Sequence, residues 1–197
     1  MSSINKQGRG RRASVVTAAL LLPALTAGPA LALPNPHDLI HRTVPASSCA
    51  PLDAAQSAKV RLSNGAWRFD GVSTGTVSFY CPLPMNAFPA DNSEPNYTEM
   101  EFFRVWYRDS DGLAVNARVT ANLRYRADNG NWESAHPGTF NSSGFADIGF
   151  SKKIFNAVHT FETDALYSFY ITIYRQNADQ TVEFHGIDFR DSSQPEG

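Results

Sequence analysis

The sequence contains little that would support a metal centre or a membrane-embedded domain. Of its 197 residues only 2 are cysteine and 5 are histidine, and 18% are charged. Beyond the N-terminal segment no run approaches the roughly 18 consecutive apolar residues of a transmembrane helix, so we expect no stable membrane insertion of the mature chain. The formal net charge of -2 excludes a general nucleic-acid-binding protein, because such proteins need a net basic surface.

Helical periodicity is also nearly absent, and strict alternation takes its place. Apolar residues occupy every second position over residues 115–125, with polar residues between them, which is typical of a strand with one buried face. Residues 103–107 carry the same pattern. We expect an antiparallel hairpin over Thr98–Arg126 in which Tyr107 faces Val115, because a register shifted by one residue would bury charge.

Further apolar and aromatic runs are separated by glycine, proline, asparagine and aspartate. We expect about eight or nine strands in all, and hence an all-β fold, namely a two-sheet antiparallel sandwich of the jelly-roll kind. An eight-stranded closed barrel is the alternative. The turn at residues 128–131 places Ala127 opposite Trp132 on the buried face and so predicts that Trp132 lies in the core, and Gly186 predicts a bulge. The strands expected outside the hairpin are 59–62, 66–69, 75–81, 144–150, 155–161, 166–175 and 181–190.

The N-terminal segment has the features of a cleavable secretory signal peptide over residues 1–32. A basic start precedes the apolar stretch Ala13–Ala27, which is too short to span a bilayer, and Ala30-Leu31-Ala32 matches a cleavage motif. We expect residues 33–57, rich in proline and alanine, to form an extended arm. A β-sandwich domain (58–191) and a polar tail (192–197) follow. The expected location is extracellular, with the periplasm as the alternative.

The two cysteines, Cys49 and Cys81, indicate one disulfide, because an even number of cysteines in an exported protein is normally paired. Closing a loop of about 33 residues would stabilise the fold by roughly 3–4 kcal/mol in the chain-entropy model. Two lone cysteines offer too few ligands for a zinc site.

The polar face of the expected hairpin carries aromatic and arginine side chains, which are unusual on a solvated surface. Aromatic rings stack on sugar rings, while arginine and asparagine donate hydrogen bonds to hydroxyl and carboxylate groups. We predict that this face binds an extracellular glycan or a cell-wall polymer. Alternatively, the arm, a loop or a second copy of the chain covers it, since exposed aromatic residues mark interfaces. The residues of this predicted face are Phe102, Arg104, Trp106, Asn116, Arg118, Thr120 and Arg124.

The motifs that could indicate catalysis or metal binding are better explained as structure. Gly71–Gly75 matches G-x-S-x-G, but it precedes a strand rather than a helix, so it indicates a turn. Asp109 and Asp111 are spaced like the start of a calcium loop but lack its downstream glutamate, which leaves them weak metal candidates. His37 and His41 fall in the expected arm.

The carboxylates show no spacing that selects a glycosidase pair. We therefore expect a non-catalytic binding module without a cofactor or a metal. A structural or self-associating secreted protein is the first alternative, and a secreted hydrolase is the second.

Several short segments stand out along the chain, in this order: Ser48-Cys49-Ala50-Pro51, Leu62-Ser63-Asn64-Gly65, Val77 to Pro84, Leu166 to Tyr170 and Phe184 to Phe189. They resemble a group of small secreted proteins of soil bacteria, with one cysteine near the mature N-terminus and a second in a V-x-x-x-C-P-[LIV]-P strand. The resemblance implies an exported β-sandwich with Cys49 bonded to Cys81, and no assigned activity. Members often carry a further cysteine pair, which this chain lacks.

Overall fold

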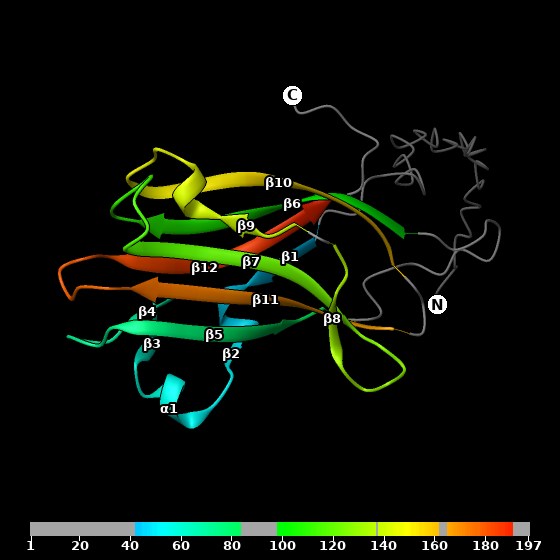
Figure 1. Cartoon of the computed structure of the whole chain (residues 1–197), viewed down its shortest axis with the longest axis horizontal. Helices are drawn as coiled ribbons and strands as arrows, with labels where there is room; N and C mark the ends of the chain where they lie inside the picture. The colour runs from blue at the N-terminus through cyan, green and yellow to red at the C-terminus, as the bar shows by residue number, and fades with distance from the viewer. Residues whose placement is uncertain (1–41, 84–97, 137, 162–164, 191–197) are drawn as a thin grey trace, which may run out of the picture. The chain divides into compact units, whose positions relative to one another are not determined.

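The computed structural model describes residues 42–83, 98–136, 138–161 and 165–190 (Figure 1). The expected signal peptide, the first part of the expected arm and the polar tail lie outside these residues. The described residues form two antiparallel sheets that pack face to face. Phe103 of one sheet lies 5.1 Å from Phe169 of the other, measured between ring centroids. The predicted all-β sandwich is therefore confirmed, and the closed barrel is not what forms.

Sheet A contains six strands, three of them long. Its strand order is β10 (Gly149–Phe161), β6 (Thr98–Asp109), β12 (Val182–Arg190), β4 (Ala66–Phe69) and β3 (Val60–Ser63), and β1 (Arg42–Pro45) also pairs with β12.

Sheet B also contains six strands. Its strand order is β2 (Ala50–Pro51), β5 (Gly75–Pro82), β11 (Leu166–Arg175), β7 (Ala117–Arg126) and β8 (Trp132–Ser134), and β9 (Phe140–Asn141) also pairs with β7. The helices η1 (Ala46–Ser48), α1 (Ala54–Ser57) and η3 (Ser142–Gly144) are single turns. Within the described ranges, no helix is long and apolar enough to cross a membrane.

The predicted hairpin over residues 98–126 is wrong, because β6 and β7 belong to different sheets. Val105 pairs with Ile187 of β12, and Val119 pairs with Ile173 of β11. The expected apolar faces of both strands are nonetheless buried, and Val105 and Val119 have no exposed surface. Alternation reports one buried face on each strand, and two strands facing each other across a core satisfy it as well as two neighbours do.

Other local predictions meet mixed outcomes. The β3–β4 hairpin turns at Asn64 and Gly65, which both have positive φ as a tight two-residue turn requires. β11 and the bulge at Gly186 are confirmed. The strand expected at 155–161 is part of the longer strand β10, which begins at Gly149, so the strand expected at 144–150 is wrong over residues 144–148. The expected arm is wrong from residue 42 onward, because β1 and β2 pair with sheets A and B.

The core is built from the inner faces of both sheets and is closed by a disulfide. Cys49, just before β2, is bonded to Cys81 of β5, which confirms the expected pair. Beside it, the indole of Trp67 packs 5.3 Å from Phe79, and its N–H donates to the carbonyl of Ala46 at 2.8 Å. This contact anchors the turn that leads the chain from sheet A into sheet B.

Candidate functional site

The predicted binding face is divided between the two sides of the sandwich. Phe102, Arg104 and Trp106 lie on the outer side of β6 in sheet A, alternating with its buried residues. Arg118, Thr120 and Arg124 lie on the outer side of β7 in sheet B, and Asn116 precedes that strand. The structure does not bring these groups together, so each outer face has to be judged separately.

On the outer face of sheet A, Arg104 is paired rather than available to a ligand. Its side chain is buried, and its Nη1 lies 3.7 Å from Oδ2 of Asp188 on the neighbouring strand β12. The indole N–H of Trp106 also donates to this oxygen, at 3.3 Å. The charge of Arg104 is therefore already compensated inside the sheet, and its predicted contact with a ligand stays a prediction.

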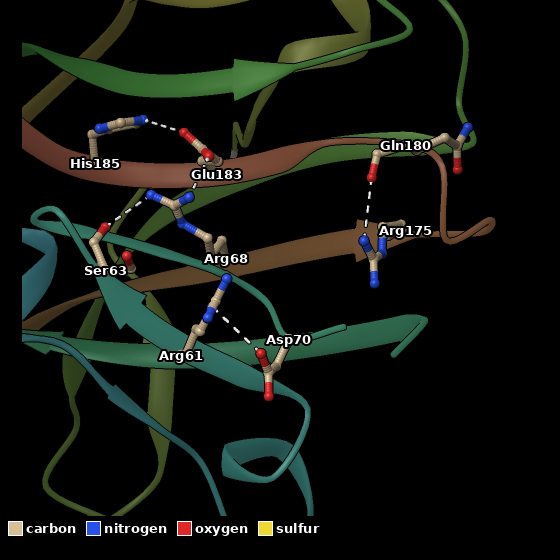
Figure 2. A network of polar contacts seen from close by, with 8 residues as sticks. All are labelled: Arg61, Ser63, Arg68, Asp70, Arg175, Gln180, Glu183 and His185. Carbon is tan, nitrogen blue, oxygen red and sulfur yellow. Dashed lines mark hydrogen bonds and ion pairs between the residues drawn. The ribbon is translucent and has the colours of Figure 1, made fainter. Parts of the chain in front are cut away.

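A second paired cluster continues along sheet A toward β4. Glu183 lies 3.6 Å from Nη1 of Arg68 and 3.0 Å from Nε2 of His185, and Arg68 also donates to the carbonyl of Ser63 (Figure 2). Glu183 is buried. The carboxylates on the outer side of β12 are thus held by cations of the same sheet.

A small pocket of about 240 Å³ lies beside these pairs. Its rings are in mutual contact, with Phe150 centred 5.9 Å from Trp106 and 5.0 Å from His185. Gly186 permits the close approach of β1, since its φ is 144° and a Cβ there would lie 2.8 Å from the carbonyl oxygen of Val44. The lining residues are Thr43, Pro45, Trp106, Phe150, His185, Gly186 and Ile187.

The outer face of sheet B carries a group of aromatic rings. Tyr80 of β5 and Tyr170 of β11 are directly opposite in the ladder, with centroids 5.4 Å apart. Trp132 of β8 lies 5.3 Å from Tyr80, although the pairing path between their strands spans three strand spacings, about 14 Å in a flat sheet. The two rings therefore reach toward each other across the face, and Figure 1 shows the chain turning after β7 past β11 toward β5.

The expectation that Trp132 lies in the core is consequently wrong. Trp132 pairs with Arg126, one position away from the predicted partner Ala127, because the loop closes with Ala127 bonded to the carbonyl of Asn131. One residue of register moves a side chain to the other face of a strand. Trp132 is partly exposed on the outer side, next to Tyr80.

Two arginines of β7 stack on tyrosines of β11. The guanidinium carbon of Arg124 lies 3.9 Å from the ring centroid of Tyr170, and that of Arg118 lies 4.7 Å from the ring centroid of Tyr174. All four side chains are partly exposed. We name Tyr80, Trp132, Tyr170, Tyr174, Arg118 and Arg124 the sheet B cluster.

The described outward positions of this face carry no carboxylate. On the three central strands they hold hydroxyl, amide, aromatic and arginine side chains and one proline, and no described aspartate or glutamate forms an ion pair with Arg118 or Arg124. In contrast with sheet A, no described carboxylate therefore compensates the charge of these two arginines. These positions are Thr76, Ser78, Tyr80 and Pro82 on β5, Ser168, Tyr170, Thr172 and Tyr174 on β11, and Arg118, Thr120, Asn122, Arg124 and Arg126 on β7.

Asp109 and Asp111, the weak metal candidates, are used to close the turn after β6. Asp109 accepts from the hydroxyl of Ser142 at 2.5 Å and from the backbone N–H of Asp111 at 3.1 Å, and Asp111 accepts from the N–H of Ala117 at 2.8 Å. Burial raises the pKa of Asp109 to about 6. No cluster of three metal-ligating side chains occurs in the described part of the chain.

The G-x-S-x-G segment also has a structural role. Arg175, buried at the end of β11, donates from Nε to the carbonyl of Ser73 and from Nη2 to that of Gly71, both at 2.9 Å. The segment is therefore a turn held through its backbone carbonyls, as expected.

The aromatic half of the sheet B cluster was not identified from the sequence. Residues 166–175 form a nearly continuous apolar run, in which Tyr170 and Tyr174 are not distinguishable from core residues by hydrophobicity. A signal does exist, because the positions between Phe169, Ile171 and Ile173 all carry hydroxyl groups. That parity marks the outer side of the strand.

No protein-family model and no curated protein matches this chain. Similar solved structures include a carbohydrate-binding module of a multidomain xylanase from the hindgut metagenome of Trinervitermes trinervoides, at 10% identity and a TM-score of 0.43, covering 78% of this chain and 99% of that chain. A xylan-binding domain from Paenibacillus barcinonensis has 10% identity and a TM-score of 0.44, covering 78% and 94%. A xylan-binding module from Roseburia intestinalis has 11% identity and a TM-score of 0.41, covering 76% and 93%.

Proposed function

We propose that this protein is an exported, non-catalytic module that binds an extracellular glycan through the sheet B cluster. The observation that carries the proposal is the contact of three partly exposed rings, Tyr80, Tyr170 and Trp132, on a sheet face rich in hydroxyl groups. Aromatic rings stack on the apolar faces of sugars, and the surrounding polar groups can bond to sugar hydroxyls. Because Arg124 covers one side of Tyr170, we assign the stacking to Trp132 and Tyr80, with Tyr170 holding Arg124 in place.

A sheet face suits an extended polymer. β11 has ten residues and is therefore about 33 Å long, and its outward side chains form one row. Both neighbours of β11 are paired to it along most of its length. The backbone beneath the rings is thus already ordered, and binding need not supply the entropy cost of ordering it.

Hydrolysis at this face is not part of the proposal. Glycoside hydrolysis requires two carboxyl groups about 5–10 Å apart on either side of the scissile bond. The outward positions of β5, β11 and β7 hold none. A binding role needs only the rings and the polar groups that are present.

Substitution of Tyr170 and of Trp132 by alanine tests the proposal. In affinity electrophoresis through gels that contain a panel of neutral and acidic polysaccharides, each variant should bind at least about 10-fold more weakly than the wild type. Trp106→Ala, on the opposite face, is the matched control and should retain binding. Loss of binding in Trp106→Ala alone would move the site to the sheet A pocket and contradict the proposal.

Self-association is the second candidate, and one element favours it. β10 is 13 residues long and forms an edge of sheet A, and its outward side carries the exposed residues Phe150, Ile154 and Val158. A long edge strand with exposed apolar side chains is a template for pairing with another chain.

A further inference from the structure

We infer that the ligand of the sheet B cluster is an acidic polysaccharide, whose carboxylate groups are bound by Arg118 and Arg124. The inference rests on the proposed function and names its substrate class. A carboxylate matches the planar fork of a guanidinium in shape and charge.

The first argument is the contrast between the arginines of the two sheets. On sheet A, Arg104 lies 3.7 Å from Asp188 and Arg68 lies 3.6 Å from Glu183. On sheet B, the described carboxylates leave Arg118 and Arg124 without an ion pair. The chain has a net charge of -2, so anionic side chains are abundant in it. None of the described ones pairs with Arg118 or Arg124, and the positive charge of these arginines is therefore available to an anion from outside.

The second argument is how the two guanidinium groups are held. Each lies over a tyrosine ring, at 3.9 Å for Arg124 and 4.7 Å for Arg118. Stacking occupies the flat side of a guanidinium and leaves the N–H groups at its edge to donate. Within the described residues, these groups make one long hydrogen bond, from Arg118 to the carbonyl of Val115 at 3.4 Å. The side chains are therefore positioned before binding, which lowers the entropy lost when they bind a ligand.

The third argument is the distance between the two arginines. They are six positions apart on the same strand, so their Cα atoms are about 20 Å apart. Thr120 lies on the same side between them. One sugar cannot reach both arginines, so the ligand must be a chain that carries anionic groups at intervals. A single uronic acid should consequently bind far more weakly than its polymer.

The experiment compares polygalacturonate with its highly methyl-esterified form, which keeps the backbone and removes the charge. Calorimetric titration of the purified protein should give tight binding of polygalacturonate, and esterification should weaken it at least about 10-fold. Arg118→Gln and Arg124→Gln should each weaken polygalacturonate binding about 10-fold. Arg124→Lys, which keeps the charge but loses the fork, should fall between Arg124→Gln and the wild type.

Arg126→Gln is the matched control, because Arg126 lies on the same strand and the same side but stacks on no tyrosine. It should change the affinity less than 3-fold at physiological salt, as roughly expected for a weakly held surface charge. Circular dichroism of every variant must show the wild-type unfolding temperature, so that lost affinity is not lost fold.

Each other outcome overturns a specific statement. Equal binding of the esterified polymer, with no effect of the arginine substitutions, would overturn the acidic ligand and leave glycan binding intact. Equal or tighter binding of dextran sulfate through the same arginines would overturn the assignment to carboxylates. Binding of single-stranded DNA as tight as that of polygalacturonate would overturn the assignment of the ligand to the polysaccharides. Failure of every polymer, neutral or acidic, to bind the folded protein would overturn the proposed function itself.

Discussion

At the scale of single residues, the buried ionisable side chains outside the candidate site have structural roles. Asp109 has no exposed surface, and burial raises its pKa from 3.8 to about 6, with the charge of Asp111 acting in the same direction. The hydrogen bonds from Ser142 and from the N–H of Asp111 oppose this shift. The carboxyl group closes a turn between the sheets, where it costs stability once it is ionised.

This raised pKa predicts a pH dependence of stability. Between pH 3.8 and about 6 the folded chain holds a proton on Asp109 that the unfolded chain releases, so the contribution of this group falls as the pH rises through that window. Asp109→Asn removes the titration. In urea unfolding from pH 4 to 7, the free energy of unfolding of the wild type should fall relative to that of the variant. Parallel curves would show that this carboxyl does not titrate there. Asp128→Asn, in an exposed turn, serves as the control.

Arg175 is a second buried residue that the sequence analysis did not single out. Besides Gly71 and Ser73, it donates from Nη1 to the carbonyls of Ala178 at 3.2 Å and Gln180 at 3.3 Å (Figure 2). Burial lowers its pKa. One side chain thus supplies the donors for two loops, at the ends of strands in both sheets.

Arg175→Met should therefore destabilise the fold by about 2–4 kcal/mol, because it leaves buried carbonyls without donors. Urea unfolding at pH 7 measures the loss. Arg61→Met is the matched control, since Arg61 pairs with Asp70 at an exposed position and should change stability by less than about 0.5 kcal/mol. A loss of similar size in both variants would mean that Arg175 contributes only as a surface charge.

At the scale of elements, β10 is the edge strand whose exposed side chains favour self-association. Ile154 is 38% exposed at the middle of this edge. If β10 pairs with a second copy, Ile154→Lys should shift the protein to monomer, because a lysine on an edge strand opposes pairing. Sedimentation velocity at several concentrations measures the change. Leu113→Lys, at an exposed loop position, should leave the distribution as in the wild type. A wild type that sediments as a monomer throughout would remove self-association from consideration.

At the scale of the whole molecule, the sandwich gives the protein two outer faces with different electrostatics. On sheet A the arginine and carboxylate side chains neutralise each other around a small aromatic pocket. On sheet B the arginines are stacked on tyrosines and are not neutralised. The inner faces of both sheets contribute to one hydrophobic core. The difference between the outer faces lies in which charges were placed outside.

Residue patterns along the chain were sufficient for the buried faces of the strands, for one hairpin and for the disulfide. Alternation identified the buried faces of β6 and β7, the Asn64-Gly65 turn located a hairpin, and an even cysteine count predicted the disulfide. Each of these signals comes from residues within one strand or turn, or from composition, and needs no knowledge of which strands pair.

Partner choice was decided only by the tertiary structure, and the candidate site depends on it. The sequence pattern of a buried strand is the same whether its partner strand lies beside it in one sheet or opposite it in the other sheet. The pattern therefore predicted Trp106 and Arg118 on one face, whereas they lie on the two opposite outer faces. A one-residue difference in loop closure moved Trp132 from the core to the surface beside Tyr80. The sheet B cluster combines four strands, and only long-range pairing brings β5 and β11 together with the β7–β8 hairpin, and so the rings with the arginines.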